Sequence, residues 1–200
     1  MISNAKTLKA KAKATLGGKA FKGGWLWPII LGFIISALAS ILSPVALLTT
    51  AIFGVALATY YSALVRRTAE AKELGVYFKG FTSKIGSNII LGLVKTIYLF
   101  LWGIIPFAGI IKTYSYAMTD FIKADNPELS ANEVITKSRQ MMNGYKWKFF
   151  CLELSFIGWY FFTVITFGVA GYWATPLINA AKAEFYEELK AINAKETVVE

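Results

Sequence analysis

The chain has 200 residues, of which 56% are hydrophobic and only 16% are charged. A soluble domain is typically about half apolar and about a quarter charged, and here the apolar residues gather in long runs. Lysine and arginine outnumber aspartate and glutamate by 21 to 12, and the chain has no histidine and one cysteine, Cys151. This composition excludes an intrachain disulfide, a thiolate metal cluster and a histidine-based catalytic triad, and we expect no metal and no cofactor.

The excess positive charge flanks the apolar runs and does not cover one face of a helix, which argues against a nucleic-acid-binding protein. The preference of lysine and arginine for the cytoplasmic side of a membrane explains the excess, as does their attraction to anionic lipids. We therefore expect the partner of these side chains to be the lipid bilayer, with anionic lipids at its cytoplasmic face.

Residues 1–24 form a basic N-terminal segment without an acidic residue. Apolar residues recur with a spacing of four, as on one helix face, at Leu8, Ala12 and Leu16. Ser3 is expected to cap the start of this helix, and Gly17-Gly18 to end it. The pattern predicts a short interfacial helix on anionic headgroups, with a mobile basic tail as the open alternative.

Long apolar runs then predict a transmembrane helical domain over residues 25–190. An 18-residue helix is about 27 Å long, which is close to the hydrocarbon thickness of a bilayer. The first run resembles a secretory signal, but another apolar helix follows it at once, so we interpret it as a span. The six predicted spans are 25–42, 45–65, 88–105, 108–122, 149–168 and 172–189, with a cytoplasmic insert at 124–147 and a C-terminal tail at 191–200.

The distribution of charge predicts the orientation of these spans. If the N-terminus is cytoplasmic, the basic segments 1–24, 66–84 and 123–148 all lie inside, while the outer turns near Pro106 and Ala170 hold no charge. Deleting the fourth span would place the basic insert outside, so we keep this span although it is short and charged. The predicted fold is thus an all-α, polytopic membrane helix bundle of about six spans with both termini cytoplasmic.

The insert between the fourth and fifth spans is the most soluble-looking part of the chain. It opens with a turn signal at Asp125, Asn126 and Pro127. Ser130 and Glu133 then have the spacing of a capping box, in which each side chain satisfies a backbone donor at a helix start. The less polar face of this helix comprises Val134, Ile135, Ser138, Met141 and Met142, and Gly144 is expected to end it. We predict an amphipathic cytoplasmic helix on the inner membrane surface.

Much of the chain resembles the uncharacterised bacterial integral membrane protein family called domain of unknown function 975. The most specific part is the run from Ala124 to Glu133, and the C-terminal Phe185–Leu189 and the lysine-rich lead into Trp25 are also similar. Further matching residues are Pro106, Lys112, Tyr114, Ser115, Tyr116, Met118, Ser138, Arg139, Met142, Gly144, Lys146, Trp147 and Leu154 to Trp159. The resemblance implies a multi-span bacterial cell-membrane protein without assigned catalytic residues, and the lead from Gly17 to Gly24 departs from it by being lengthened.

Charged residues inside the predicted spans are the main candidates for a functional site, because each is costly in hydrocarbon and is normally paired or functional. By depth, Glu153 is expected to meet Lys95 or Lys182. The functional interpretation is an ion or substrate pathway, and the structural alternative is a buried pair or lysines that reach the interface. The candidate intramembrane charge network is Lys95, Lys112, Asp120, Glu153, Lys182 and Glu184.

Small residues give a candidate site of helix packing. Gly32, Ser36 and Ser40 lie four apart on the first span and would let a neighbouring helix approach closely. Gly54 and Ala58 continue the pattern on the second span. We favour packing of these two spans within one chain over a dimer interface, because the short turn between them already makes them neighbours.

No nucleotide-binding, serine-hydrolase or zinc-protease motif is present. The leading hypothesis is therefore a non-enzymatic binding or accessory protein of the bacterial cell membrane, whose partner is a membrane protein, a peptide or a lipid. The alternative is a small transporter or channel subunit that uses the intramembrane charges. An intramembrane lipid-modifying enzyme based on Asp120 and Asp125 is a third hypothesis, and the oligomeric state is left open.

Overall fold

The fold was described from a computed structural model, which covers residues 2–17, 29–30, 46–67, 74–82, 84–103 and 108–199. Within these ranges all regular secondary structure is helical, so the all-α prediction is confirmed. The predicted first span at 25–42, with its Gly32, Ser36 and Ser40 stripe, lies outside the described residues except for helical Ile29 and Ile30.

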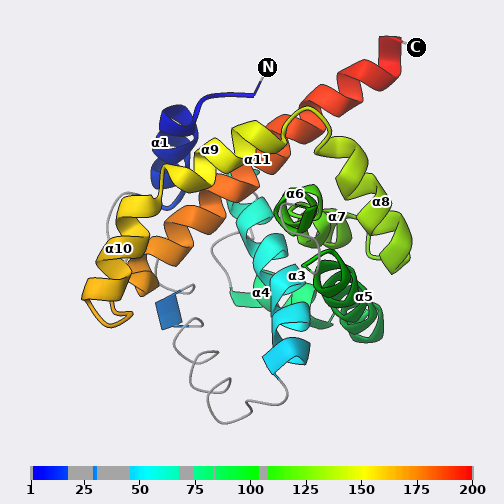
Figure 1. Cartoon of the computed structure of the whole chain (residues 1–200), viewed down its shortest axis with the longest axis horizontal. Helices are drawn as coiled ribbons and strands as arrows, with labels where there is room; N and C mark the ends of the chain where they lie inside the picture. Colours follow the sequence, from blue (N-terminus) through cyan, green and yellow to red (C-terminus); the bar gives the residue numbers. More distant parts are fainter. Residues whose placement is uncertain are drawn as a thin grey trace.

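Helix α1 (Ala5–Thr15) begins at Asn4, whose side chain accepts a hydrogen bond from the Thr7 amide, so the expected cap at Ser3 is wrong by one residue. The helix ends before Gly17, which adopts the left-handed conformation with φ 84°, as predicted. The spacing-of-four residues Leu8, Ala12 and Leu16 are all buried. Their partner is α11 (Gly171–Val199) rather than lipid, which corrects the interfacial interpretation of this face (Figure 1).

Helix α3 (Ala46–Val65) lies at the centre of the fold and contacts α4 (Leu74–Thr82), α5 (Ile85–Gly103), α7 (Thr119–Asp125) and α11. The two helices α3 and α4 lie close together at Gly80, where an added Cβ would lie only 2.6 Å from the Thr59 Oγ1 atom. Any side chain at this position would force the two helices apart. The second and third predicted spans thus correspond to α3 and α5.

The fourth predicted span is wrong as a single helix, because the chain forms α6 (Ala108–Ser115) and α7 (Thr119–Asp125) with a turn between them. The turn leaves backbone groups that need partners, and Ser138 supplies them. Its hydroxyl donates to the Ser115 carbonyl at 2.8 Å and accepts from the Met118 amide at 3.3 Å. The break is therefore stabilised by a side chain from a later helix.

Helix α8 (Ala131–Met141) begins with the predicted capping box, in which Ser130 and Glu133 satisfy each other's backbone amides. The buried residues of its less polar face are those expected, but α5 and α7 cover them. The prediction that this face lies on the membrane surface is therefore wrong. Gly144, with φ 76°, follows in the turn to the next helix.

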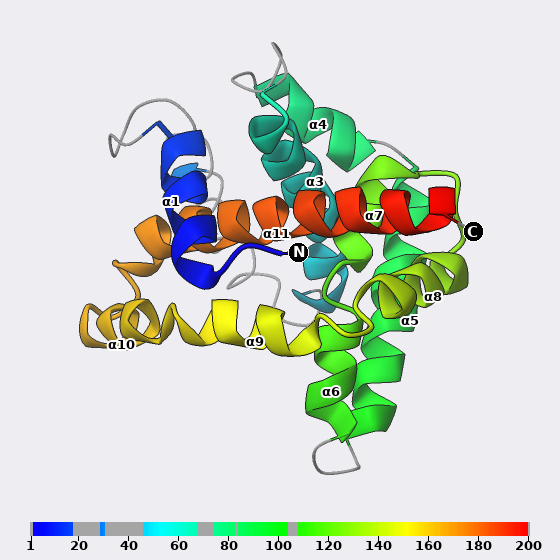
Figure 2. The same cartoon turned by 90° about the horizontal axis from the view of Figure 1, so that it is seen from above.

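The last predicted spans correspond to α9 (Lys146–Leu154) with α10 (Ile157–Ile165), and to α11 (Gly171–Val199). A turn at Ser155 and Phe156 separates α9 from α10, and α11 extends well past its expected end at residue 189. Figure 2 shows α9 and α10 end to end, with α11 roughly parallel to them and α5 and α6 running across their direction.

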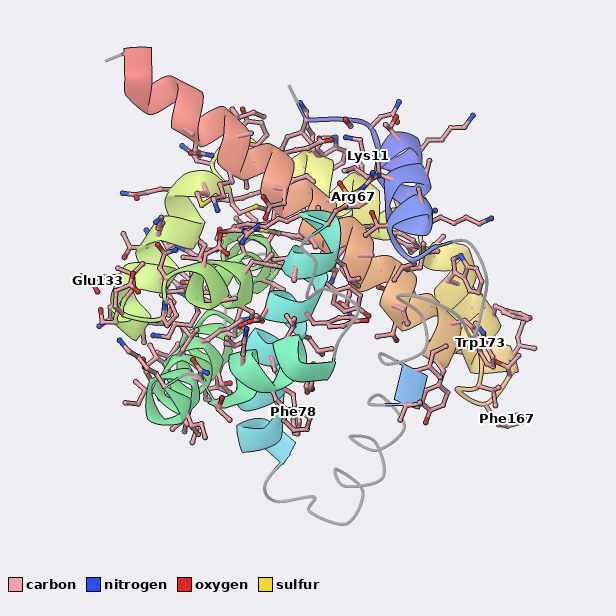
Figure 3. The ribbon with its side chains drawn as sticks, turned by 180° about the vertical axis from the view of Figure 1, so that it is seen from behind. Lys11, Arg67, Phe78, Glu133, Phe167 and Trp173 are labelled. Atoms are coloured by element: carbon pink, nitrogen blue, oxygen red, sulfur yellow. The ribbon has the colours of Figure 1, made fainter. Side chains whose placement is uncertain are left out.

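The exposed faces of α5, α6 and α10 are strongly apolar. Two helical segments of the described chain, Ile85–Trp102 and Lys146–Ile165, are long and apolar enough to cross a membrane, and only 11% and 17% of their residues are buried. Helix α10 has no buried residue at all, although all its residues except Gly158 and Thr163 are hydrophobic. Figure 3 shows Phe167 at the outer tip of the turn between α10 and α11, where its side chain is 99% exposed.

Candidate functional site

Two ion pairs lie side by side in the middle of the helical assembly. Lys95 of α5 donates to the Asp120 carboxylate of α7 at 3.0 Å, and Lys182 of α11 lies 2.8 Å from the Glu153 carboxylate of α9. Of the two partners predicted as alternatives for Glu153, Lys182 is the one that pairs with it, and Lys95 pairs with Asp120 instead. Four residues of the predicted charge network therefore come together from four helices.

These four side chains line one cavity of about 270 Å³, which we call the paired-charge cavity. Each of the four is between 23% and 30% exposed, so neither pair is sealed from solvent. The space is large enough for several water molecules, each of which occupies about 30 Å³ in the liquid. The remaining lining residues are Gly54, Leu57, Ala58, Tyr61, Leu99, Thr113, Tyr114, Tyr116, Ala117, Phe121, Phe149 and Asn179.

Gly54 of α3 makes room for the Asp120 carboxylate. A Cβ at position 54 would lie 3.2 Å from the Asp120 Oδ2 atom, closer than most carbon–oxygen contacts. Asp120 also sits in the first turn of α7, where the helix dipole favours a negative charge. The small residue on α3 and the turn before α7 together position this carboxylate beside Lys95.

Two residues of the predicted network lie elsewhere. Lys112 places its ammonium group over the Trp102 ring, 4.1 Å from the ring centroid. Glu184 accepts a hydrogen bond from the Thr15 hydroxyl of α1 at 2.9 Å. Lys112 therefore makes a cation–π contact, Glu184 holds α1 on α11, and neither lines the paired-charge cavity.

A second cluster of charges surrounds Asp125 at the end of α7. Its Oδ2 atom accepts from Arg66 at 2.7 Å, from Lys190 at 2.7 Å and from the Tyr186 hydroxyl at 3.1 Å. Burial of Asp125 opposes its ionisation, but the hydrogen bonds from Arg66 and Lys190 outweigh that effect and hold its pKa below the usual value. Glu187 accepts two further bonds from the Arg66 guanidinium, at 2.9 and 2.6 Å.

The family-like motif around Asp125 acts as a connector between α7 and α8. Lys123 is 1% exposed, and its ammonium group donates to the Pro127 carbonyl at 2.9 Å, the Leu129 carbonyl at 2.6 Å and the Ser87 hydroxyl at 2.6 Å. Burial, and then the nearby charge of Lys84, lower the pKa of Lys123. The turn that follows α7 is therefore folded around a buried lysine.

A cavity of about 740 Å³ opens beside Asp125, and we call it the end cavity. Its cationic side chains come from three parts of the chain, namely Arg66 after α3, Lys137 of α8 and Lys190 of α11. The other lining residues are Asp125, Asn126, Gln140, Met141, Tyr186, Asn193 and Ala194. Lys137 is exposed and has no carboxylate partner among the residues that the structure describes.

Sequence reasoning missed Arg66, Lys123 and Lys190 as parts of a site. Arg66 belongs to the segment 66–84, which was predicted only to be basic and cytoplasmic, and Lys190 lies just after the last predicted span. Their common neighbour Asp125 was singled out through the family-like motif, which was the available signal. In the described ranges no group of three potential metal ligands from histidine, cysteine, aspartate and glutamate comes together.

Comparison with known proteins identifies a family but no characterised relative. No curated protein and no solved structure matches the sequence. A family model described as "Protein of unknown function (DUF975)" matches residues 82–193, which cover more than half of the chain. The match includes in full three of the four helices that carry the charged side chains of the paired-charge cavity. The match includes the connector around Asp125 and most of α11. The chain therefore belongs to the DUF975 family of proteins of unknown function.

Proposed function

We propose that the chain is a multi-pass integral protein of the bacterial cell membrane, with six spans and both termini cytoplasmic, and that it binds a ligand rather than catalysing a reaction. The proposed ligand is a small zwitterion in the paired-charge cavity. The observation that carries this role is the convergence of four charged side chains from four helices on one cavity.

The membrane location is supported by the apolar outer surface. Large hydrophobic side chains of α5 and α10 are exposed, including Phe100 at 73% and Val164 at 76%. A monomeric soluble protein rarely exposes a contiguous apolar surface of this kind. Helix α10 is composed almost entirely of hydrophobic residues and buries none of them against the protein, which fits contact with hydrocarbon.

The balance of charge in the paired-charge cavity favours a zwitterionic ligand. Lys95 and Lys182 offer two ammonium groups, and Asp120 and Glu153 offer two carboxylates. A purely anionic ligand would be repelled by the carboxylates, and a purely cationic one by the lysines. A solute with one group of each sign forms charge-assisted hydrogen bonds with both kinds of partner.

A binding screen in mild detergent tests this role. The purified chain is heated in the presence of individual amino acids or phosphoethanolamine, and we expect at least one to raise its melting temperature. Asp120→Asn and Lys182→Met should each lower the affinity for that ligand about tenfold, since each removes a charge-assisted hydrogen bond. Lys112→Met, which removes an equal charge outside the cavity, should leave affinity within about twofold. A wild-type protein that no zwitterion stabilises would contradict the proposal.

A small transporter or channel subunit is the second candidate. Transporters place polar groups at mid-depth in the membrane, and the predicted spans that carry Lys95, Glu153 and Lys182 put these residues in that region. Uptake of the bound zwitterion into reconstituted vesicles, abolished by Glu153→Gln, would assign transport. Binding without uptake would leave the chain as a binding protein.

The other hypotheses have less support. A paired-aspartate lipid-modifying enzyme needs Asp120 and Asp125 at one site, but Asp120 lines the paired-charge cavity and Asp125 lines the end cavity. An accessory role with a membrane-protein or peptide partner would use the cytoplasmic segments 66–84 and 124–147. Crosslinking through these segments in native membranes should then recover the same partner repeatedly.

A further inference from the structure

We infer that the end cavity is a second binding site, which takes a phosphate group carried by a lipid headgroup or by a soluble phosphate ester. The site is separate from the paired-charge cavity and goes beyond the zwitterion-binding role proposed above. Its defining residues are Arg66, Lys137 and Lys190, which approach from three different parts of the chain.

The charge of the cavity favours an anion. Asp125 is its one lining carboxylate, and this charge is already neutralised by hydrogen bonds from Arg66 and Lys190. Glu187, which does not line the cavity, accepts hydrogen bonds from the same Arg66 guanidinium. Even with both carboxylates counted, the three cations leave an excess of positive charge, and Lys137 supplies it without a carboxylate partner in the described part of the chain.

The hydrogen-bond donors suit the tetrahedral oxygens of a phosphate. The Nη1 group of Arg66 takes part in neither of its ion pairs and remains to donate, as does the Lys137 ammonium group. The Gln140 side chain, one turn further along α8, adds a neutral amide donor to the wall. Arginine and lysine together provide both directional and point-charge contacts to phosphate.

The size of the cavity fits a phosphate with an organic group attached. Its volume of about 740 Å³ lies within the range of small-molecule sites, roughly 300–1,000 Å³, and far exceeds the space that a lone phosphate needs. Met141 and Ala194 give part of the wall an apolar character. The Tyr186 ring, stacked on Phe121 at a centroid distance of 5.3 Å, forms a rigid side. A glycerol phosphate unit matches this mixture of walls.

The test compares two variants of α8 that lose the same charge. Lys137→Met removes a cation that lines the end cavity, and Arg139→Met removes an exposed cation of the same helix that does not. Binding is measured on the full chain in two arms: glycerol 3-phosphate at constant ionic strength in detergent, and nanodiscs of phosphatidylcholine with or without phosphatidylglycerol, followed by native mass spectrometry of retained lipid.

We expect Lys137→Met to weaken binding about tenfold in the arm where wild-type binds, and Arg139→Met to leave it within about twofold. Binding in the detergent arm identifies a soluble ester, and retention of phosphatidylglycerol alone identifies a lipid headgroup. Binding in neither arm, or equal weakening by the two variants, overturns the inference. Asp120→Asn and Lys182→Met, the two substitutions in the paired-charge cavity, should not change binding in either arm. The result is therefore independent of the zwitterion screen.

Discussion

Three side chains from two other segments of the chain converge on Asp125. Arg66 approaches from the end of α3, Lys190 from α11 and Tyr186 from one turn earlier in α11, and all three donate to the same carboxylate. Because the pKa of Asp125 is held below its usual value, the ionised form is favoured by folding. The negative charge at this position therefore stabilises the contact between α7 and α11.

This linkage predicts how stability changes with pH. The stabilising effect of Asp125 is present above the usual carboxyl pKa and is lost as the pH falls through the lowered, folded-state pKa. Asp125→Asn should lower the melting temperature near pH 7, and this difference from wild type should shrink as the pH is lowered towards 3. Glu128→Gln, at an exposed neighbouring position, serves as the control and should follow the wild-type curve. A constant difference across the pH range would contradict the assignment.

At the residue scale, sequence reasoning found the charged groups but only half of their pairing. Depth along the predicted spans indicated Lys95 or Lys182 as the partner of Glu153, and Glu153 does pair with Lys182. The partner of Lys95 was not predicted, because Asp120 was expected at the inner end of an unbroken span. The turn before α7 and the space left by Gly54 bring Asp120 beside Lys95, and neither feature is readable from hydropathy.

The break between α6 and α7 is the clearest departure of an element from its predicted form. Residues 108–122 have the composition of one short span, but a turn at residues 116–118 divides them. The partner that makes the turn tolerable, Ser138, lies 20 residues beyond Met118 in the sequence. A contact at that separation cannot be inferred from local pattern alone.

Removing the Ser138 hydroxyl tests how much the break depends on it. Ser138→Ala should leave the Ser115 carbonyl and the Met118 amide without partners in a buried environment, at a cost of about 1–3 kcal/mol of unfolding free energy. Thr136→Ala on the exposed side of α8 should change stability by less than about 0.5 kcal/mol. Denaturation of both variants in one detergent gives the comparison, and equal stability of the two would show that Ser138 does not support the turn.

Elements with local signals were predicted more accurately. The capping box at Ser130 and Glu133 and the end of α1 at Gly17 depend on residues within one turn of each other, and both are confirmed. What covers an amphipathic face was not predictable in the same way. The apolar faces of α1 and α8 were assigned to the membrane surface, but neighbouring helices cover them, since periodicity identifies a buried face without identifying its partner.

At the scale of the whole molecule, the apolar surface and the crossing of the helices both bear on how the chain sits in a bilayer. Membrane-spanning helices are usually tilted by about 20° from the bilayer normal, within about 40°. In Figure 2, α5 and α6 run across the direction of α9, α10 and α11, so the two sets cannot both run along one bilayer normal. Whether α9, α10 and α11 cross the bilayer depends on which side of it the turn between α10 and α11 lies.

Site-specific labelling tests the six-span topology. Because Cys151 is the single cysteine, Cys151→Ser gives a background for new cysteines. An impermeant maleimide should label Val169→Cys in intact cells, since this exposed turn is expected outside, and should label Thr136→Cys only after permeabilisation. Protection of position 169 in intact cells would mean that α9, α10 and α11 remain on the cytoplasmic side.

The way α1 is held against the rest of the chain has a practical consequence for anyone who makes this protein. The Ser3 amide and hydroxyl both donate to the Glu188 carboxylate, at 2.7 and 2.8 Å, and the Ile2 side chain is 5% exposed. An affinity tag or fluorescent fusion joined ahead of these residues must emerge beside α11, where it competes with that contact. The opposite terminus projects from the body in Figure 1 and offers a site where such a fusion leaves the packing of α1 undisturbed.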